Sequence, residues 1–140
     1  MTREPRAALY SPELLALAVE LADYPYDPTA PLQGEARSRS CGSTIQLSAG
    51  SEQLGLKVTA CAVGQAAAAI FAREFPGKSH AELEKVLHQI EEWLHGAGVR
   101  PDWPGIEMLE TARAYPGRHG AILLPWRAAL DALSKGKPAR

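Results

Sequence analysis

The stretch that decides the fold spans residues 44–60 and has the sequence TIQLSAGSEQLGLKVTA. On both sides of its polar centre, apolar residues alternate with polar or small ones, which is the period of a strand with one buried face. Residues 44–48 and 54–60 are therefore predicted to be strands, and residues 49–53 the turn that joins them as an antiparallel hairpin. The other predicted elements are placed relative to this hairpin.

Upstream of the hairpin, the sequence predicts one helix and one further strand. Ser11 is a suitable N-cap, Pro12 suits the first helical position, and an apolar face then continues to about residue 22. A weaker strand around residues 35–37 would complete a three-stranded antiparallel sheet. Strands followed by helices indicate the α+β class.

Downstream of the hairpin, the pattern is helical. A helix is predicted from residue 62 to the Phe-Pro-Gly sequence at 75–77, and a second follows the capping box formed by Ser79 and Glu82. A shorter helix is expected at 106–113. Because proline is tolerated in the first turn of a helix, Pro125 predicts that the last helix begins near residues 120–122. The sheet is thus expected to be packed by about four to five helices.

Composition limits the classes of function. A chain of 140 residues is the size of one ordinary domain, expected to span 1–140 with an ordered core at about 9–133. Fifteen basic and sixteen acidic residues leave a formal charge of -1, so neither nucleic acid nor an anionic membrane is an expected partner. The N-terminus lacks the apolar run of a secretory signal, and no stretch suits a membrane span, so a cytoplasmic location is expected.

The two cysteines, Cys41 and Cys61, are the candidate functional residues. Cys41 lies in a turn before the first hairpin strand, and Cys61 follows the second strand just ahead of a helix, whose N-terminal dipole favours a thiolate. Antiparallel pairing places both at the same end of the hairpin, so we expect them to lie close together. The alternative is that both are small buried apolar residues, as free cysteines often are.

Four segments occur in a recognisable order: Gly-Glu-Ala at 34–36, Cys-Gly at 41–42, Cys-Ala-Val-Gly-Gln-Ala at 61–66, and residues 118–126 in the closing helix. Together they resemble the iron–sulfur cluster assembly scaffold family, which includes IscU, SufU and the N-terminal domain of NifU. The resemblance covers about residues 9–133 and is strongest to the SufU-like branch. It implies a three-stranded antiparallel sheet flanked by helices, in agreement with the elements predicted above.

The resemblance also implies a function and a set of partners. Proteins of this family are scaffolds or carriers rather than enzymes. They receive sulfur from a cysteine desulfurase, assemble a [2Fe–2S] cluster or hold zinc, and pass the product to recipient apo-proteins. Carried over by position, Cys41 and Cys61 would bind the cluster, its iron, or zinc. A homo-oligomer is compatible with this role.

The other ligands of the family pattern differ in this chain. The first family motif is typically Cys-Gly-Asp, and Ser43 stands at the position of the Asp. Aligning Arg118 and Trp126 without gaps places Ala121 at the third cysteine. His119 is displaced by one residue from the family's histidine or lysine, and it remains the candidate third metal ligand.

Three hypotheses follow for the cysteine pair. The first is an iron–sulfur scaffold or carrier with Cys41 and Cys61 as sulfur acceptors and ligands. The second is a degenerate family member that docks on the assembly machinery without binding a cluster, because Ser43 and Ala121 replace ligands. The third is a dithiol redox protein, although the cysteines lack Cys-X-X-Cys spacing.

Overall fold

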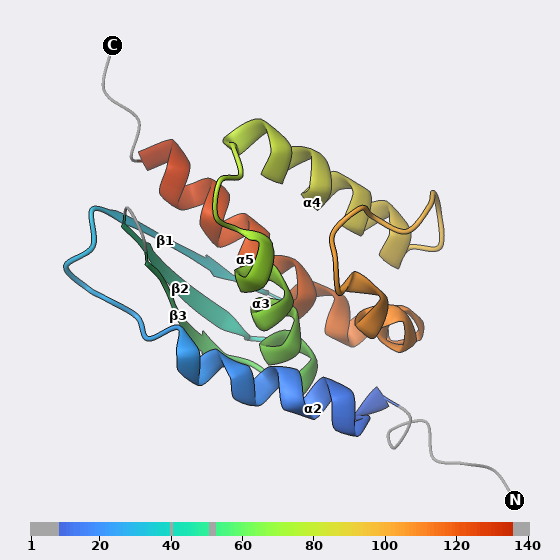
Figure 1. The fold of residues 1–140 in the computed structure, drawn as a ribbon. Helices are drawn as coiled ribbons and strands as arrows, with labels where there is room; N and C mark the ends of the chain where they lie inside the picture. The colour runs from blue at the N-terminus through green and yellow to red at the C-terminus, as the bar shows by residue number, and fades with distance from the viewer. Residues whose placement is uncertain (1–8, 40, 51–52, 136–140) are drawn as a thin grey trace, which may run out of the picture.

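A three-stranded antiparallel sheet forms one layer of the computed structural model, which describes residues 9–39, 41–50 and 53–135 (Figure 1). The strands are β1 (Leu32–Arg37), β2 (Thr44–Ala49) and β3 (Leu54–Thr59), in the spatial order β1-β2-β3. Both predicted hairpin strands are therefore confirmed. The third strand is also present and begins three residues earlier than expected, because pairing with β2 extends it beyond what its own sequence pattern indicates.

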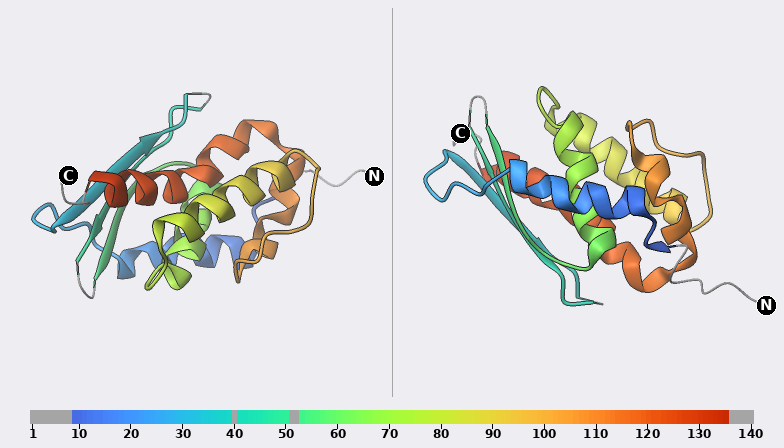
Figure 2. Two further views of the ribbon diagram at one scale, coloured as in Figure 1. Left: turned by 90° about the horizontal axis from the view of Figure 1, so that it is seen from above. Right: turned by 60° about the horizontal axis from the view of Figure 1, so that its bottom comes forward.

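The register of the sheet separates its two faces. Leu47 lies opposite Leu56, and Thr44 lies opposite Thr59 at the end of the sheet that leads to the cysteines. Ile45 and Leu47 point to the same side and are fully buried, as the period of two requires. The helices therefore cover the face that carries these apolar side chains, as both views in Figure 2 show.

The second layer consists of helices. They are α2 (Pro12–Val19), α3 (Ala62–Glu74), α4 (His80–Leu94) and α5 (Pro116–Lys135), with 3₁₀ helices at Glu20–Asp23 and Ile106–Ala114. Helix α5 packs on β1 and β2, α3 packs against α5 and α2, and α4 packs against α5. The predicted α+β class is confirmed. Within the described ranges, no helix has the length and apolar character needed to cross a membrane.

The predicted starts of two helices are confirmed by their caps. The Leu14 backbone N–H donates to the Ser11 hydroxyl over 3.1 Å at the start of α2. At the start of α4, the Glu82 N–H donates to the Ser79 hydroxyl, while the Ser79 N–H donates to the Glu82 carboxylate. These bonds satisfy donors that have no partner within the helix.

The predicted start of the last helix is wrong. Helix α5 begins at Pro116, and Pro125 lies inside it. Proline at the first helical position explains the earlier start, since its missing N–H would be unpaired there in any case. The interior Pro125 is tolerated because the buried neighbours Leu124 and Trp126 hold this part of the helix against the core. The predicted helix at 106–113 is present with 3₁₀ geometry, ending at Ala114.

Gly34 on β1 allows α5 to lie directly on the sheet. A Cβ atom at this position would lie 2.6 Å from the Ala132 backbone nitrogen and 2.8 Å from the Ala132 Cβ, and it would also clash with the Ala128 carbonyl oxygen. Next to this contact, the Glu35 N–H donates to the Asp131 carboxylate over 3.0 Å. The strand and the helix are therefore in backbone contact.

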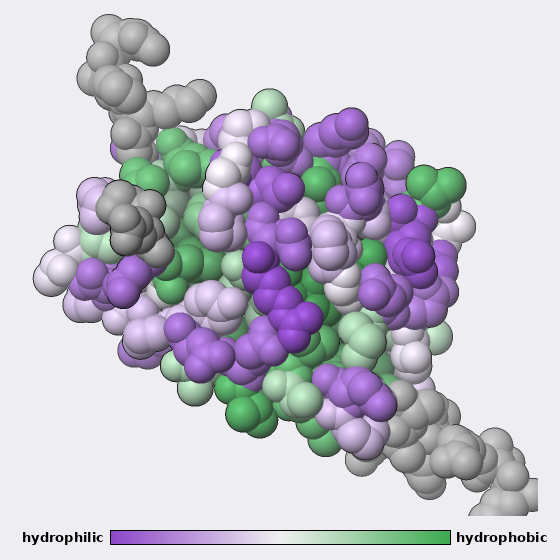
Figure 3. Space-filling view, in the orientation of Figure 1, coloured by the Kyte–Doolittle hydropathy of each residue, from purple (hydrophilic) through white to green (hydrophobic). Residues whose placement is uncertain are grey.

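An aromatic cluster fills the core between the helices. Phe71 stacks on Trp103 with ring centroids 5.8 Å apart, and Trp126 meets both rings edge-on. The indole N–H of Trp103 donates to the Ile70 carbonyl over 3.0 Å, which anchors the loop before the second 3₁₀ helix. On the surface, hydrophilic residues gather over α4 (Figure 3).

Candidate functional site

Cys41 lies in the tight turn that joins β1 to β2. The Ser38 N–H donates to the Ser43 carbonyl over 2.8 Å, and the Gly42 N–H donates to the Ser38 carbonyl over 2.9 Å. Gly42 has φ 73°, a left-handed conformation that glycine adopts without strain. This turn leaves Cys41 exposed while Ser38 and Ser43 are buried beneath it.

Two serine hydroxyls contact the Cys41 thiol, and the positive charge of an arginine acts on it. The Sγ atom lies 3.3 Å from Oγ of Ser38 and 3.1 Å from Oγ of Ser43. Partial burial alone raises the pKa of Cys41. Hydrogen bonds with Ser38, with the Ser43 hydroxyl and with the Ser43 backbone, together with the positive charge of Arg118, outweigh burial and hold this pKa below its usual value. The environment of Cys41 therefore favours the thiolate form.

Cys61 occupies the N-cap position of α3. Its side chain makes no capping hydrogen bond, and the residue is half-buried. The Gln65 side chain donates to the Ala60 carbonyl over 2.9 Å, which ties the first turn of α3 to the end of β3. The backbone that carries the Cys61 thiol is therefore fixed, and the thiol itself makes no capping hydrogen bond to the start of α3.

Helix α5 connects the surroundings of the two cysteines. Its residue Arg118 acts on the Cys41 thiol, and Ala121, one turn further along, faces Gly64 of α3. A Cβ atom on Gly64 would lie 3.0 Å from the Ala121 Cβ, and Gly64 is one turn from Cys61. The same side of α5 therefore meets both sites. Figure 1 shows α3 beginning where β3 ends, and α5 starting beyond that end of the sheet and running back over β1 and β2.

Arg118 was missed as a site residue from sequence, although it belongs to the segment that carries the family resemblance. Its Nη2 donates to the Tyr10 hydroxyl over 3.0 Å. Its Nε is buried and has no hydrogen-bond partner among the residues that the structure describes. Placing the helix start at Pro116 rather than near residue 120 would have indicated that Arg118 lies on the first turn of α5. Nothing in the local sequence indicates the role of Ser38.

His119 lies away from the two thiols. Its Nε2 is 3.0 Å from the Arg113 carbonyl oxygen, and its ring meets the His95 ring edge-on with centroids 6.1 Å apart. In the described ranges, no three His, Cys, Asp or Glu side chains form a group able to hold a metal ion. The structure thus brings Cys41 and Cys61 to one end of the sheet without His119, whose role as a ligand stays a prediction.

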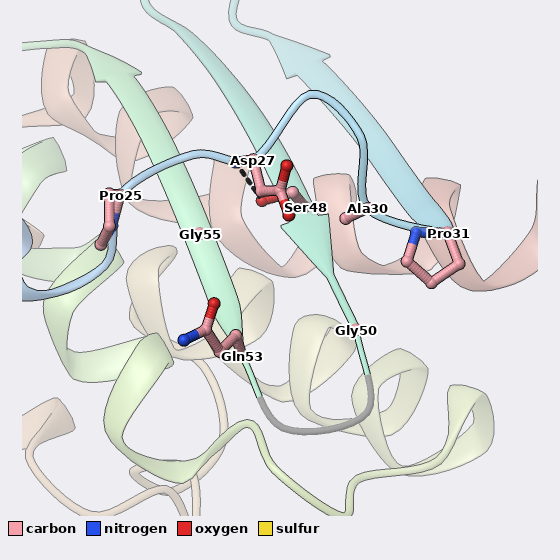
Figure 4. Close-up of a pocket in the computed structure, with 8 residues that line it drawn as sticks. All are labelled: Pro25, Asp27, Ala30, Pro31, Ser48, Gly50, Gln53 and Gly55. Atoms are coloured by element: carbon pink, nitrogen blue, oxygen red, sulfur yellow. Dashed lines mark hydrogen bonds between the residues drawn. The ribbon is translucent and has the colours of Figure 1, made fainter.

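A separate pocket of about 500 Å³ lies at the opposite, hairpin end of the sheet (Figure 4). Among the described residues that line it, Asp27 alone is ionisable, and its carboxylate accepts hydrogen bonds from Thr29, which lower its pKa. The Asp27 N–H donates to the Ser48 hydroxyl over 2.9 Å. The lining comprises Pro25, Asp27, Ala30, Pro31, Ser48, Gly50, Gln53 and Gly55. With its charged and hydroxyl groups already partnered, this pocket is a weaker candidate than the cysteine site.

The fold and the site define an α+β protein with two thiols at one end of an antiparallel sheet. No family profile and no curated protein matches the sequence. Among solved structures, the N-terminal part of a nitrogen-fixing NifU-like protein from Brucella abortus matches with a TM-score of 0.82 and 23% identity, covering 94% of this chain and 96% of that one.

A second solved structure is a protein named as an iron–sulfur cluster assembly scaffold of the SUF system, from Fervidobacterium islandicum. It matches with a TM-score of 0.73 and 21% identity over 90% of this chain and 97% of that chain. A third, a hypothetical protein, has a TM-score of 0.62 and 17% identity over 87% and 97% of the two chains. The chain therefore has the fold of NifU-like and SufU proteins, as expected from the resemblance.

The serine contacts of Cys41 predict the pH dependence of its reactivity. In a Cys61→Ser background, alkylation of Cys41 should reach half its maximal rate at a lower pH than alkylation of the unfolded protein. Removing a hydrogen bond to the thiolate raises the thiol pKa, so Ser43→Ala should move this midpoint to higher pH. The measurement is the rate of iodoacetamide modification as a function of pH.

The matched control is Ser48→Ala, which removes a buried hydroxyl from β2, at the end of the strand far from the Cys41 turn. Its alkylation midpoint should equal that of the parent protein. An unchanged midpoint in Ser43→Ala would contradict the role given to the serine contact.

Proposed function

We propose that this chain is a sulfur-receiving scaffold or carrier in iron–sulfur cluster assembly. The observation that carries the proposal is the environment of Cys41, an exposed thiol that is hydrogen-bonded to two hydroxyls and has a pKa lowered by them and by the charge of Arg118. The fold it shares with NifU-like and SufU proteins supports the same function. The proposed partners are a cysteine desulfurase, which supplies the sulfur, and recipient apo-proteins in the cytoplasm.

The proposed chemical step is a thiol exchange at Cys41. The Cys41 thiolate attacks the outer sulfur of the persulfide on the donor's cysteine, forming a new S–S bond. The old S–S bond breaks, and its electron pair leaves with the donor's cysteine as a thiolate. One sulfur atom moves to Cys41 without net oxidation or reduction. The Arg118 Nε–H, which has no partner among the described residues, and the charge of this guanidinium would stabilise the resulting anion.

The metal cargo requires more donors than one chain supplies at this site. A [2Fe–2S] cluster is held by four ligands, and a structural zinc ion also has four. Cys41 and Cys61 provide two thiolates, and within the described residues no third His, Cys, Asp or Glu joins them. Cys41 and Cys61 are proposed as ligands of iron or of a cluster only together with donors from outside this site. Those donors would come from a second copy, from a partner protein, or from His119 after its ring leaves the Arg113 carbonyl.

A second candidate function is an interaction module that docks on the assembly machinery without carrying sulfur or a cluster. The observation that favours it is the pair Ser43 and Ala121, which occupy the Asp and third cysteine positions of the family pattern. The Ala121 methyl group packs closely against Gly64, where an added Cβ would lie only 3.0 Å from it. Position 121 therefore contributes packing and no ligand.

Sulfur transfer from a desulfurase separates the two functions. The purified chain is incubated with a cysteine desulfurase and cysteine labelled with radioactive sulfur, and the label on the chain and in released sulfide is summed. We expect about one equivalent of label for each chain, as single-site exchange requires. A chain that binds the desulfurase and gains no label would contradict sulfur receipt and support the interaction module.

A further inference from the structure

We propose that Cys61 is the resolving thiol of this site: it attacks the persulfide formed on Cys41, releases sulfide, and closes a Cys41–Cys61 disulfide. This inference rests on the proposed function, since it requires that Cys41 first receives sulfur. It assigns the second cysteine a chemical step of its own, and it identifies the released product as hydrosulfide.

The placement of the two cysteines relative to the sheet supports this step. The last paired residues of the hairpin are Thr44 and Thr59, which lie opposite each other. Cys41 precedes Thr44 by three residues and Cys61 follows Thr59 by two, so both lie just beyond the same end of the sheet. The Cys41 Sγ contacts the buried Ser43 hydroxyl, so the thiol lies on the helix-covered side of the sheet, where α3 begins.

Helix α5 passes near the surroundings of both thiols. The positive charge of Arg118 acts on the Cys41 thiol, and Ala121 packs on Gly64 in the first turn of the helix that Cys61 caps. Residues three apart on a helix lie on one side of it, about 5–6 Å apart between Cβ atoms. The same stretch of α5 is therefore near Cys41 and near the first turn of α3.

The two thiols differ in exposure, as expected if Cys41 receives sulfur first and Cys61 reacts second. Cys41 is exposed, so a large donor protein reaches it, whereas Cys61 is half-buried. The Cys61 side chain makes no capping hydrogen bond, so no such contact has to break before it reacts. The absence of a third donor group within the described ranges leaves both thiols uncommitted to a metal in one chain.

The proposed step balances without an outside reductant. The Cys61 thiolate attacks Sγ of Cys41, and the S–S bond of the persulfide breaks with its electron pair going to the outer sulfur, which leaves as hydrosulfide. The transferred sulfur gains two electrons, and the two cysteine sulfurs supply them by becoming a disulfide. If the Cys61 thiolate attacks the outer sulfur instead, the persulfide moves to Cys61. The Cys41 thiolate then attacks Sγ of Cys61, and the products are the same disulfide and hydrosulfide. A further round requires a dithiol reductant of the thioredoxin class.

The test uses the full chain and glutathione persulfide as the sulfur donor, with excess donor removed before the measurement. Sulfide release and the mass of the unreduced protein are followed for wild type, Cys61→Ser and Cys41→Ser. Wild type should release one sulfide for each sulfur received and lose the mass of two hydrogen atoms. Cys61→Ser should keep the mass of one added sulfur and release sulfide roughly tenfold or more slowly.

The outcomes separate the two proposals. If Cys61→Ser gains a sulfur and wild type keeps one with equal stability, the resolving role of Cys61 is overturned while sulfur receipt stands. If Cys61→Ser gains no sulfur from this donor or from a desulfurase, the proposed function itself fails. Cys41→Ser should release no sulfide, and release at the wild-type rate would overturn the order of the two steps.

Discussion

Replacing Cys41 with serine is expected to abolish sulfur uptake from a cysteine desulfurase. Serine keeps the size of the side chain, and position 41 is exposed, so the fold is unaffected. The variant lacks the thiolate that attacks the donor persulfide, and the serine hydroxyl, which stays neutral near pH 7, is not nucleophilic enough to replace it. The measurement is the total labelled sulfur on the chain and in released sulfide.

Cys61→Ser is the matched control for this prediction. It also removes one thiol from the same end of the sheet, and it leaves the hydroxyl contacts of Cys41 in place. This variant should take up sulfur at the wild-type rate. Equal uptake by Cys41→Ser and Cys61→Ser would show that either thiol accepts sulfur and would contradict the special role of the Cys41 environment.

Gly34→Ala is expected to destabilise the fold by about 3 kcal/mol, the upper part of the range for overpacked sites. The added methyl group would lie 2.6 Å from the Ala132 nitrogen and would also clash with the Ala128 carbonyl. Both obstacles are backbone atoms of α5, which cannot rotate away as a side chain would. Urea unfolding followed by circular dichroism measures the decrease in the free energy of unfolding.

Gly117→Ala provides the control for the glycine substitution. Position 117 lies in the first turn of the same helix, and a Cβ there meets no atom within 4 Å. Its free energy of unfolding should stay within about 0.5 kcal/mol of wild type, as for other surface substitutions. If Gly34→Ala were equally harmless, the close approach of β1 to α5 would not be a requirement of the fold.

The elements that were predictable from sequence carry their own local signals. The hairpin alternates apolar and polar residues through β2 and β3, and the start of α4 has both halves of a capping box at Ser79 and Glu82. The full extent of β1 was not predictable, because its pairing partner β2 stabilises it. The start of α5 was misplaced because two prolines, Pro116 and Pro125, both suit a first turn, and only packing against the core decides between them.

In the candidate site, too, some features were predictable from local sequence and others arise only from tertiary packing. The hairpin register alone predicts that Cys41 and Cys61 lie at one end of the sheet, and the structure places the end of β3 and the start of α3 there. The contribution of Arg118 depends on how α5 crosses the sheet, a tertiary feature that no short motif encodes. His119 lies beside His95, which is 24 positions earlier in the chain, and this contact likewise arises only when α4 packs on α5.

The paired ligand assignment and the resolving role of Cys61 both depend on Cys41 and Cys61 forming one site, and the disulfide equilibrium of the wild-type chain tests this most directly. The protein is equilibrated anaerobically with mixtures of reduced and oxidised glutathione at low protein concentration, and unreduced peptides are identified by mass spectrometry. Two thiols at one end of the sheet should give a monomer with a Cys41–Cys61 cross-link, since the second thiol displaces glutathione from the first. Separate glutathione adducts on both cysteines, with no cross-linked peptide at any ratio, would contradict a shared site.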